Sequence, residues 1–378
     1  MRRGLQLGKI MGIPFQLDYS WFIIFIFVTV ILSSSYFPHF AEQHDYSWSP
    51  AACWILGIIT SVLFFASVLA HELAHSAVSI RSGIPVKSIT LFIFGGVAHI
   101  AREATRPTTE LRMAAAGPLC SVALCGLFGG LWWLSRDFSV HLSALAAYLA
   151  IINGMLAAFN MIPGFPLDGG RVLRSIIWMI SANYRRATHI ATLSGYAVSY
   201  IFILGGIFFM FFLVGGWLNG LWFIFIGFFL NSATRASYRQ TMVREDLKGF
   251  SAKDVMLRDL PHVRPNASIK EVIQGQPLLP SIPCFLVTDE ERLAGFLTLG
   301  QIKQVPREYW DLTTAGQAMT PAEQVKAVRP SDDAVTVLEH IEEENLNLVV
   351  VVGEGKFLGI IVRDVLIQFA MSLQGPKH

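Results

Sequence analysis

The chain has 378 residues, of which 53% are hydrophobic and 15% are charged, and its mean hydropathy is +0.51. This composition is typical of a membrane protein rather than of a soluble globular one. The formal net charge of +2 gives no indication of a nucleic-acid partner, and we predict none.

Six apolar segments are long enough to cross a membrane, which takes about 20 mostly apolar residues. They lie at Leu17–Phe37, Ala52–Ile80, Ala114–Leu134, Leu142–Ile162, Ile190–Val214 and Trp217–Leu230. Basic residues gather in alternate loops, such as Arg81 and Lys87 after the second span, whereas the opposite loops contain only Arg136. By the positive-inside rule we predict that both termini are cytoplasmic, in a bacterial-type inner or plasma membrane.

The second span contains ionisable residues in an otherwise apolar run, His71-Glu72-Leu73-Ala74-His75. On a helix the two histidines project from one face, one turn apart, so both imidazoles can reach one Zn²⁺. Glu72 lies beside the first histidine, where it can accept a proton from a water molecule at the metal. Ionisable groups at membrane depth cost roughly 2.5–3.5 kcal/mol each on insertion scales, so this cluster indicates a function.

The segment after this span changes character. Gly83-Ile84-Pro85 breaks the helix, and residues 86–94 are then rich in β-branched and aromatic side chains. Gly95-Gly96 provides a bend before the next short apolar run. We therefore predict a short membrane-associated β-hairpin over residues 86–100.

The end of the fourth span supplies a third candidate ligand, which matters because catalytic zinc sites usually have three protein ligands. Two prolines and three glycines between Met161 and Arg171 exclude a continuous helix there. Asp168 lies in this run, and its residue type fits either a metal ligand or the cap of the helix that follows. Asn160, at the end of the span, either donates a hydrogen bond to a developing oxyanion or hydrogen-bonds between helices.

The last third of the chain is more polar and contains an internal repeat. The pattern Met256…Val263-Arg264-Pro265…Gly295-Phe296-Leu297 recurs, at an offset of about 64 residues, as Met319…Val328-Arg329-Pro330…Gly359-Ile360-Ile361. Each copy predicts helix–strand–strand–helix, and two such copies are expected to pack as one α/β domain. We predict a membrane domain at 1–235, a linker at 236–250 and a tandem domain at 251–378, with copies at about 251–310 and 314–370.

The two membrane motifs together resemble those of the site-2 protease family of intramembrane zinc metalloproteases. The resemblance depends on His71-Glu72-Leu73-Ala74-His75 and on Asn160…Pro163…Pro166-Leu167-Asp168-Gly169-Gly170-Arg171, and it covers roughly residues 5–235. It implies one zinc ion per chain, held by His71, His75 and Asp168. It also implies Glu72 as the catalytic base, Asn160 as an oxyanion or substrate contact, and the 86–100 hairpin as the strand that receives substrate.

The tail resembles a pair of CBS modules over roughly residues 250–370. Copies that bind adenosine nucleotides usually end a strand with Thr or Ser and have Asp three residues later, and these two side chains hold the ribose. The first copy has Thr298 but Gln301, and the second has Val362 with Asp364 one residue early. We therefore predict only weak nucleotide binding at the CBS pair.

The predicted fold is a polytopic α-helical membrane protein with about six transmembrane helices and a short β-hairpin, followed by a cytoplasmic α/β CBS pair. The predicted function is zinc-dependent cleavage of membrane-anchored proteins within or near a transmembrane segment, with the CBS pair as a regulatory or substrate-handling module. The family implies the lipid bilayer, membrane-anchored substrates and an upstream site-1-type protease as partners. Two alternatives stay open: a CBS-regulated metal or ion transporter, and a non-catalytic family member.

Overall fold

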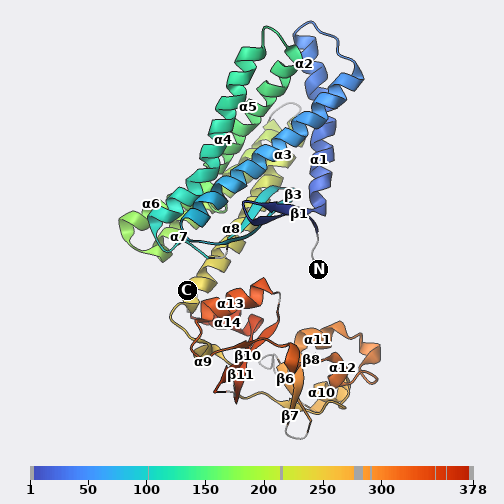
Figure 1. The fold of residues 1–378 in the computed structure, drawn as a ribbon, viewed down its shortest axis with the longest axis vertical. Coiled ribbons are helices and arrows are strands. Elements are labelled where there is room, and N and C mark those ends of the chain that lie inside the picture. Colours follow the sequence, from blue (N-terminus) through green and yellow to red (C-terminus); the bar gives the residue numbers. More distant parts are fainter. Residues whose placement is uncertain are drawn as a thin grey trace. The chain divides into compact units, whose positions relative to one another are not determined.

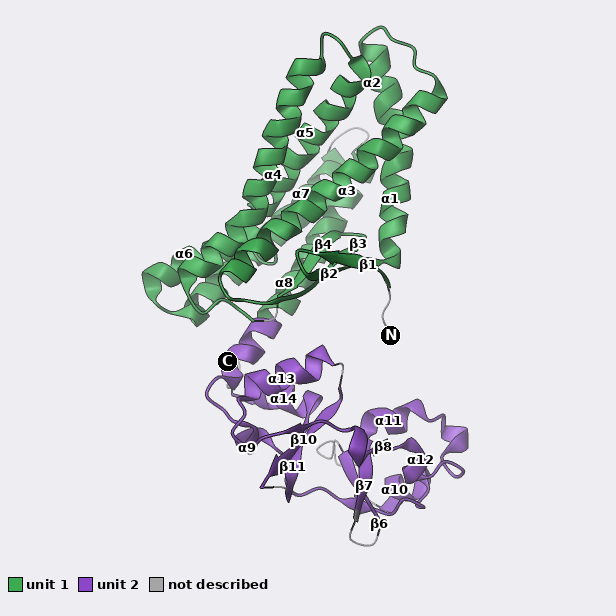
Figure 2. Cartoon of the chain, viewed as in Figure 1, with its two compact units in different colours: residues 1–238 green, residues 239–378 purple. Residues whose placement is uncertain are grey.

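The computed structural model divides the chain into two compact units, residues 1–238 and 239–378 (Figure 2). It describes residues 4–100, 102–212, 216–275, 284–289, 292–344, 346–354 and 356–373. The first unit is mainly helical, and the second is a mixture of short strands and helices.

Long helices and one small sheet make up the first unit (Figure 1). Its elements are β1 (Gly4–Ile10), β2 (Ile13–Asp18), α1 (Tyr19–Ile31), a π-helical turn (Leu32–Tyr36), α2 (Phe37–Gln43), α3 (Pro50–Arg81), β3 (Val86–Phe92), β4 (Gly95–Ile100), α4 (Pro107–Ser135), α5 (Val140–Asn160), α6 (Asp168–Ser181), α7 (Tyr184–Phe212) and α8 (Trp217–Leu247). Among the described residues, six helical segments are long and apolar enough to cross a membrane: Tyr19–Gln43, Pro50–Arg81, Pro107–Ser135, Val140–Asn160, Tyr184–Phe212 and Trp217–Leu247. This confirms the predicted number of spans.

Cap residues and prolines determine where several of these helices begin. Asp18 precedes α1, and its side chain accepts a hydrogen bond from the Ser20 N–H at 2.9 Å. Ser49 caps α3 in the same way, with Pro50 at the first helical position, where no N–H is needed. α4 likewise begins at Pro107. These local signals set the start of the helices that carry the candidate site.

A sheet with the strand order β1-β2-β3-β4 lies against α1 and α3 (Figure 1). β3 and β4 pair antiparallel, with Leu91 opposite Gly96, which confirms the hairpin predicted at 86–100. The hairpin of β1 and β2 was not predicted from the sequence, and it extends the sheet by parallel pairing of β2 with β3. Its signals were the alternation of apolar and other residues over Leu5–Lys9 and the turn at Met11-Gly12.

The second unit contains two similar sets of short strands and helices. After α8 its elements are α9 (Ala252–Val255), β5 (His262–Val263), α10 (Ile269–Gly275), β6 (Cys284–Asp289), β7 (Arg292–Thr298), α11 (Leu299–Gln304), a 3₁₀ turn (Arg307–Tyr309), α12 (Ala315–Ala318), β8 (Thr320–Pro321), a second 3₁₀ turn (Ala322–Gln324), β9 (Ala327–Val328), α13 (Ala334–Glu343), β10 (Leu348–Gly353), β11 (Lys356–Val362) and α14 (Arg363–Ser372). The described strands form two sheets, β5-β6-β7-β8 and β11-β10-β9.

The two copies share backbone pairing and an apolar core. Leu257, in the first copy, exchanges backbone hydrogen bonds of 2.8 and 3.0 Å with Ile360 of β11. β8, from the second copy, pairs with β7 of the first. One apolar cluster includes Phe296 from the first copy and Val350 from the second. Neither copy buries its apolar face alone, which explains why the repeat occurs as a pair.

The boundary between the two units falls within α8. The helix continues to Leu247, and its last turns, from Arg239 onward, belong to the second unit. Much of the stretch predicted as a linker at 236–250 is therefore helical, and Val243 and Leu247 belong to an apolar cluster of the second unit. The domain limits at 1–235 and 251–378 stay predictions.

Candidate metal centre

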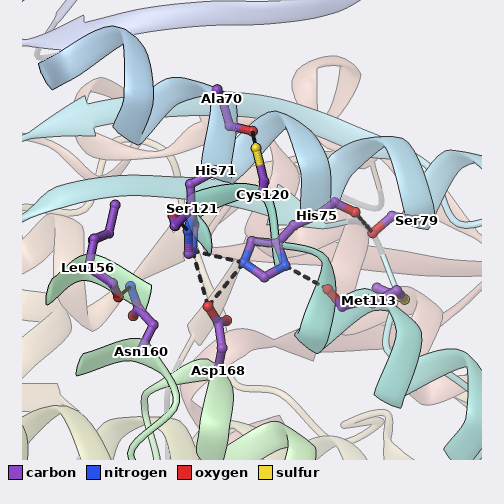
Figure 3. Close-up of polar contacts among 10 residues, drawn as sticks. All are labelled: Ala70, His71, His75, Ser79, Met113, Cys120, Ser121, Leu156, Asn160 and Asp168. Atoms are coloured by element: carbon purple, nitrogen blue, oxygen red, sulfur yellow. Dashed lines mark hydrogen bonds and ion pairs between the residues drawn. The ribbon is translucent and has the colours of Figure 1, made fainter. Parts of the chain in front are cut away.

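Three side chains from two distant segments converge in the first unit (Figure 3). His71 and His75 lie one turn apart on α3, and Asp168 is the first residue of α6. Oδ2 of Asp168 is 3.2 Å from Nε2 of His71 and 3.1 Å from Nε2 of His75, and the two Nε2 atoms are 3.2 Å apart. The structure thus brings together the three residues predicted from the sequence as metal ligands.

Each histidine has a partner on α4 that orients its ring. Nδ1 of His75 donates to the backbone carbonyl of Met113 at 2.6 Å, because a carbonyl oxygen only accepts. In a neutral His75, Nε2 therefore carries the free lone pair, and this atom faces Asp168. Nδ1 of His71 lies 2.8 Å from Oγ of Ser121. Such partners hold imidazoles in the tautomer and orientation that metal binding requires.

The converging atoms suit a zinc ion. His71 and His75 are only 3% and 5% exposed, so water does little to screen the Nε2 lone pair of a neutral His75 from the Asp168 carboxylate that it faces. A cation offsets that repulsion. Donor atoms around a tetrahedral zinc at roughly 2.0–2.1 Å lie roughly 3.3 Å apart, close to the separations found here. Two imidazoles and one carboxylate also form a ligand set typical of catalytic zinc sites.

Space beside the two imidazoles depends on a glycine of α4. A Cβ added at Gly117 would lie 2.2 Å from Nε2 of His75 and 2.5 Å from Nε2 of His71, far inside van der Waals contact. Only a residue without a side chain fits there. This role of Gly117 was not predicted from the sequence, although Gly117-Pro118 inside an apolar span was an available signal.

Glu72 and Asn160 line a cavity of about 320 Å³ that also borders His71. The other walls are largely apolar and are formed by Ile24, Val28, Phe64, Phe65, Val68, Ile93, Phe94, Gly95, Gly96 and Leu156. Gly96 of β4 leaves room for Glu72, since a Cβ at Gly96 would lie 2.5 Å from Cγ of Glu72. Asn160 donates one amide hydrogen to the Leu156 carbonyl at 3.0 Å (Figure 3). Both predicted catalytic residues thus face one cavity beside the three converging side chains.

Close backbone packing holds the segment that leads to Asp168. A Cβ at Gly169 would lie 2.4 Å from the backbone oxygens of Met161 and Ile162, so the chain folds back on itself there. Oγ1 of Thr234, on α8, donates to the Phe165 carbonyl at 2.6 Å. The N-cap position of α6 is Leu167 rather than Asp168, whose carboxylate is directed to the histidines. Irregular backbone of this kind is tolerated in a helical membrane domain where protein surrounds it.

Comparisons with known proteins bear on the identity of this site. Residues 59–137 and 134–204 match the profile described as “Peptidase family M50”, and residues 252–308 and 315–371 match that of “CBS domain”. The chain is 34% identical to “Putative zinc metalloprotease sll0528” of Synechocystis sp., over 97% of this chain and 96% of that relative. The chain belongs to the M50 family, the site-2 proteases.

Other similar proteins extend the comparison. This site-2 protease is 29% identical to “Zinc metalloprotease MJ0392” of Methanocaldococcus jannaschii, over 100% of this chain and 99% of that relative. The solved structure “Site-2 Protease from Methanocaldococcus jannaschii” has 30% identity and a TM-score of 0.41, and the match covers 62% of this chain and 94% of that chain.

Family membership makes the site-2 protease an integral membrane metallopeptidase that uses zinc, with CBS domains in its tail. The predictions of a helical membrane domain, a zinc cofactor and a CBS pair are therefore confirmed. The same assignment favours the predicted peptidase over the alternative of an ion transporter.

A Gly117→Ala variant is expected to lose most of its bound zinc, because the added methyl group would occupy the space next to both Nε2 atoms. Gly126→Ala on the same helix is the matched control, since nothing lies within 4 Å of the Cβ that it adds. Plasma mass spectrometry of the purified proteins measures zinc per chain. A Gly117→Ala variant with the zinc content of the control would contradict the prediction.

Proposed function

We propose that this site-2 protease hydrolyses peptide bonds of membrane-anchored proteins within or beside a transmembrane segment, with His71, His75 and Asp168 as the zinc ligands. The observation that carries the proposal is the convergence of two imidazole nitrogens and a carboxylate oxygen at 3.1–3.2 Å. A second carboxylate, that of Glu72, lines the adjoining cavity. One carboxylate is thus available to bind the metal and another to move a proton.

Zinc, when bound, supplies Lewis-acid activation of water and stabilises negative charge on the substrate carbonyl oxygen. Glu72 carries out the proton transfers. Its carboxylate accepts a proton from water as the water oxygen bonds to the carbonyl carbon, and it returns a proton to the amine nitrogen as the C–N bond breaks. The carboxylate is thereby restored. Asn160 has a second amide hydrogen beyond the one given to Leu156, and it donates this hydrogen to the developing oxyanion.

The edge of the small sheet supports a role in holding substrate. A helical substrate segment hides its peptide bonds in intrahelical hydrogen bonds, so it must unwind before cleavage. β4 lies at the end of the described strand order and offers backbone groups that an extended segment can pair with. Gly96 brings this strand against Glu72. We infer that the substrate adds to β4 with its scissile bond near that carboxylate.

Charge in the loops supports the proposed orientation. Arg81 and Lys87 follow the second span, and Arg185 and Arg186 lie at the start of the fifth, on the side where both termini would also lie. We infer cytoplasmic termini in a bacterial-type inner or plasma membrane. Regulated intramembrane proteolysis further implies an upstream site-1-type protease, which shortens the substrate on the other side of the membrane.

The CBS pair is proposed as a regulatory or substrate-handling module with weak nucleotide affinity. Oε1 of Gln301 accepts hydrogen bonds from the N–H and the hydroxyl of Thr298, at 2.8 and 2.9 Å. Nε2 of Gln301 donates to Oγ1 of Thr320 at 2.7 Å. The side chains of Thr298 and Gln301, which would be expected to bind the ribose, thus already hydrogen-bond to each other. In the second copy Val362 has no hydroxyl, and Asp364 is exposed one position early.

Asp168→Ala is expected to abolish stoichiometric zinc binding, since it removes one of three protein ligands. Asp137→Ala is the control, because the Asp137 side chain is 84% exposed and its carboxylate pairs only with the neighbouring Arg136 in the described ion pairs. Zinc content and the unfolding temperature with and without zinc are measured together, because a ligand that binds only the folded protein raises that temperature. Full zinc content in Asp168→Ala would remove this residue from the ligand set.

Glu72→Gln is expected to retain zinc but to cleave at least about 10²-fold more slowly, because an amide cannot accept the proton of water. Glu42→Gln, an exposed position on α2, controls for the chemical change. Cleavage of a membrane-anchored reporter is followed in proteoliposomes, and zinc is measured on the same samples. Near-normal cleavage by Glu72→Gln would show that another group transfers the proton.

The full-length protein is expected to bind AMP and ATP more weakly than the micromolar range, because Gln301 lacks the charge of an aspartate. A charge-assisted hydrogen bond is worth roughly 1.5–3 kcal/mol, so Gln301→Asp is expected to tighten binding about tenfold or more. Gln317→Asp, in the capping box of α12, is the matched control. Titration calorimetry decides the outcome, and micromolar affinity in the unmodified protein would contradict it.

A further inference from the structure

A buried ion pair ties α6 to the first turn of α4. Arg174 of α6 is 5% exposed and Glu110 of α4 is 1% exposed, so both charges are almost completely removed from water. Nε of Arg174 donates to Oε1 of Glu110 at 2.6 Å, and the Nη2 group donates to the same oxygen. A second arginine of α6, Arg171, has its Nε 4.0 Å from that oxygen. Two cations of one helix therefore face a single carboxylate of another.

The guanidinium of Arg174 also contacts the segments on either side of α6. Its Nη1 group donates at 2.8 Å to the hydroxyl of Tyr184, the first residue of α7, and that hydroxyl donates to Glu103. Its central carbon lies 5.0 Å from the ring centroids of both Phe165 and Tyr184. Phe165 belongs to the irregular segment that ends three residues later at Asp168. Arg174 thus contacts α4, α7 and the approach to Asp168 at once.

Arg174 and Glu110 lie on α6 and α4, and both of these helices contribute to the metal centre. Asp168 begins α6, six residues before Arg174, so a rigid helix of 14 residues connects the ion pair to the predicted ligand. Glu110, Met113 and Gly117 are spaced by three and four residues and therefore share one face of α4. Met113 orients His75 and Gly117 leaves space beside both imidazoles. The ion pair therefore connects the helix of the carboxylate to the helix that orients the histidines.

We propose that Arg174 and Glu110 are positioning residues that hold α6 in register on α4, so that Asp168 meets His71 and His75 at the separation that zinc requires. Neither residue belongs to the three converging side chains or lines the adjoining cavity, and the proposal rests on the ligand assignment made above. A charged pair suits this task because sliding of one helix along the other would leave a buried charge without its partner. An apolar contact would tolerate such a shift.

Arg174→Lys and Glu110→Gln test the proposal in the full-length protein. Lys keeps the charge but lacks the planar fork that donates to Glu110 and Tyr184 together, and Gln keeps the shape but lacks the charge. Tyr36→Phe is the control. It removes the 3.1 Å hydrogen bond that Tyr36, in the π-helical turn, donates to the Ala144 carbonyl of α5. The variant leaves α6 and Glu110 unchanged.

Three quantities are measured for each protein: the unfolding temperature without metal, the zinc dissociation constant, and the visible absorption spectrum with Co²⁺ in place of zinc. The spectrum reports coordination geometry, which a general loss of stability does not change in the folded fraction. Arg174→Lys and Glu110→Gln are expected to weaken zinc binding about tenfold or more and to alter the Co²⁺ spectrum. Tyr36→Phe is expected to lower only the unfolding temperature.

The proposal is wrong if Arg174→Lys and Glu110→Gln lower the unfolding temperature yet bind zinc with unchanged affinity and give an unchanged spectrum. If Arg174→Lys does not fold, Glu110→Gln decides alone, because it is isosteric. Asp168→Ala distinguishes the ligand assignment from the positioning role. Retained zinc in Asp168→Ala overturns the ligand assignment, whereas its loss there together with normal zinc binding in Glu110→Gln overturns only the positioning role.

Discussion

Two imidazole nitrogens and a carboxylate oxygen lie within 3.2 Å of one another, and both histidines are almost completely removed from water. The lone pair of an unprotonated Nε2 and a carboxylate oxygen repel at that distance, and a largely buried carboxylate is costly unless a cation is near. Other residues of the first unit arrange these atoms so that a cation can bind between them. Met113 and Ser121 orient the rings, Gly117 leaves space, and α6 carries Asp168 against them.

The division of labour among the elements follows from their geometry. α3 presents His71 and His75 on one face because they are four residues apart, and Glu72 lines the neighbouring cavity, which His71 also borders. A sheet edge supplies what helices cannot, which is unpaired backbone for an extended segment. Gly96 brings the sheet edge next to α3, since only a glycine lets β4 approach Glu72 so closely. In the proposed mechanism, proton transfer by Glu72 and pairing of substrate with β4 therefore take place side by side.

In the CBS pair the spacing associated with ribose binding is also the spacing of a helix capping box. Thr298 is the N-cap of α11 and Gln301 its third residue, and their side chains and backbones bond reciprocally. Glutamine serves this structural purpose as well as an aspartate does, since Ser251 and Asp254 form the same box at α9. It lacks the charge that a ribose partner would use. Gln301 therefore serves the helix cap, and its lack of charge is the basis of the weak nucleotide binding that we propose.

By itself the sequence determined the six spans, the 86–100 hairpin, the tandem repeat and the spacing of His71, Glu72 and His75. These features depend on local periodicity and turn chemistry, which short stretches encode. Only the tertiary structure decided what Asp168 faces and that Arg174 pairs with Glu110, contacts 97 and 64 residues apart along the chain. Such contacts depend on how whole helices pack, and no local pattern specifies the register of one helix on another.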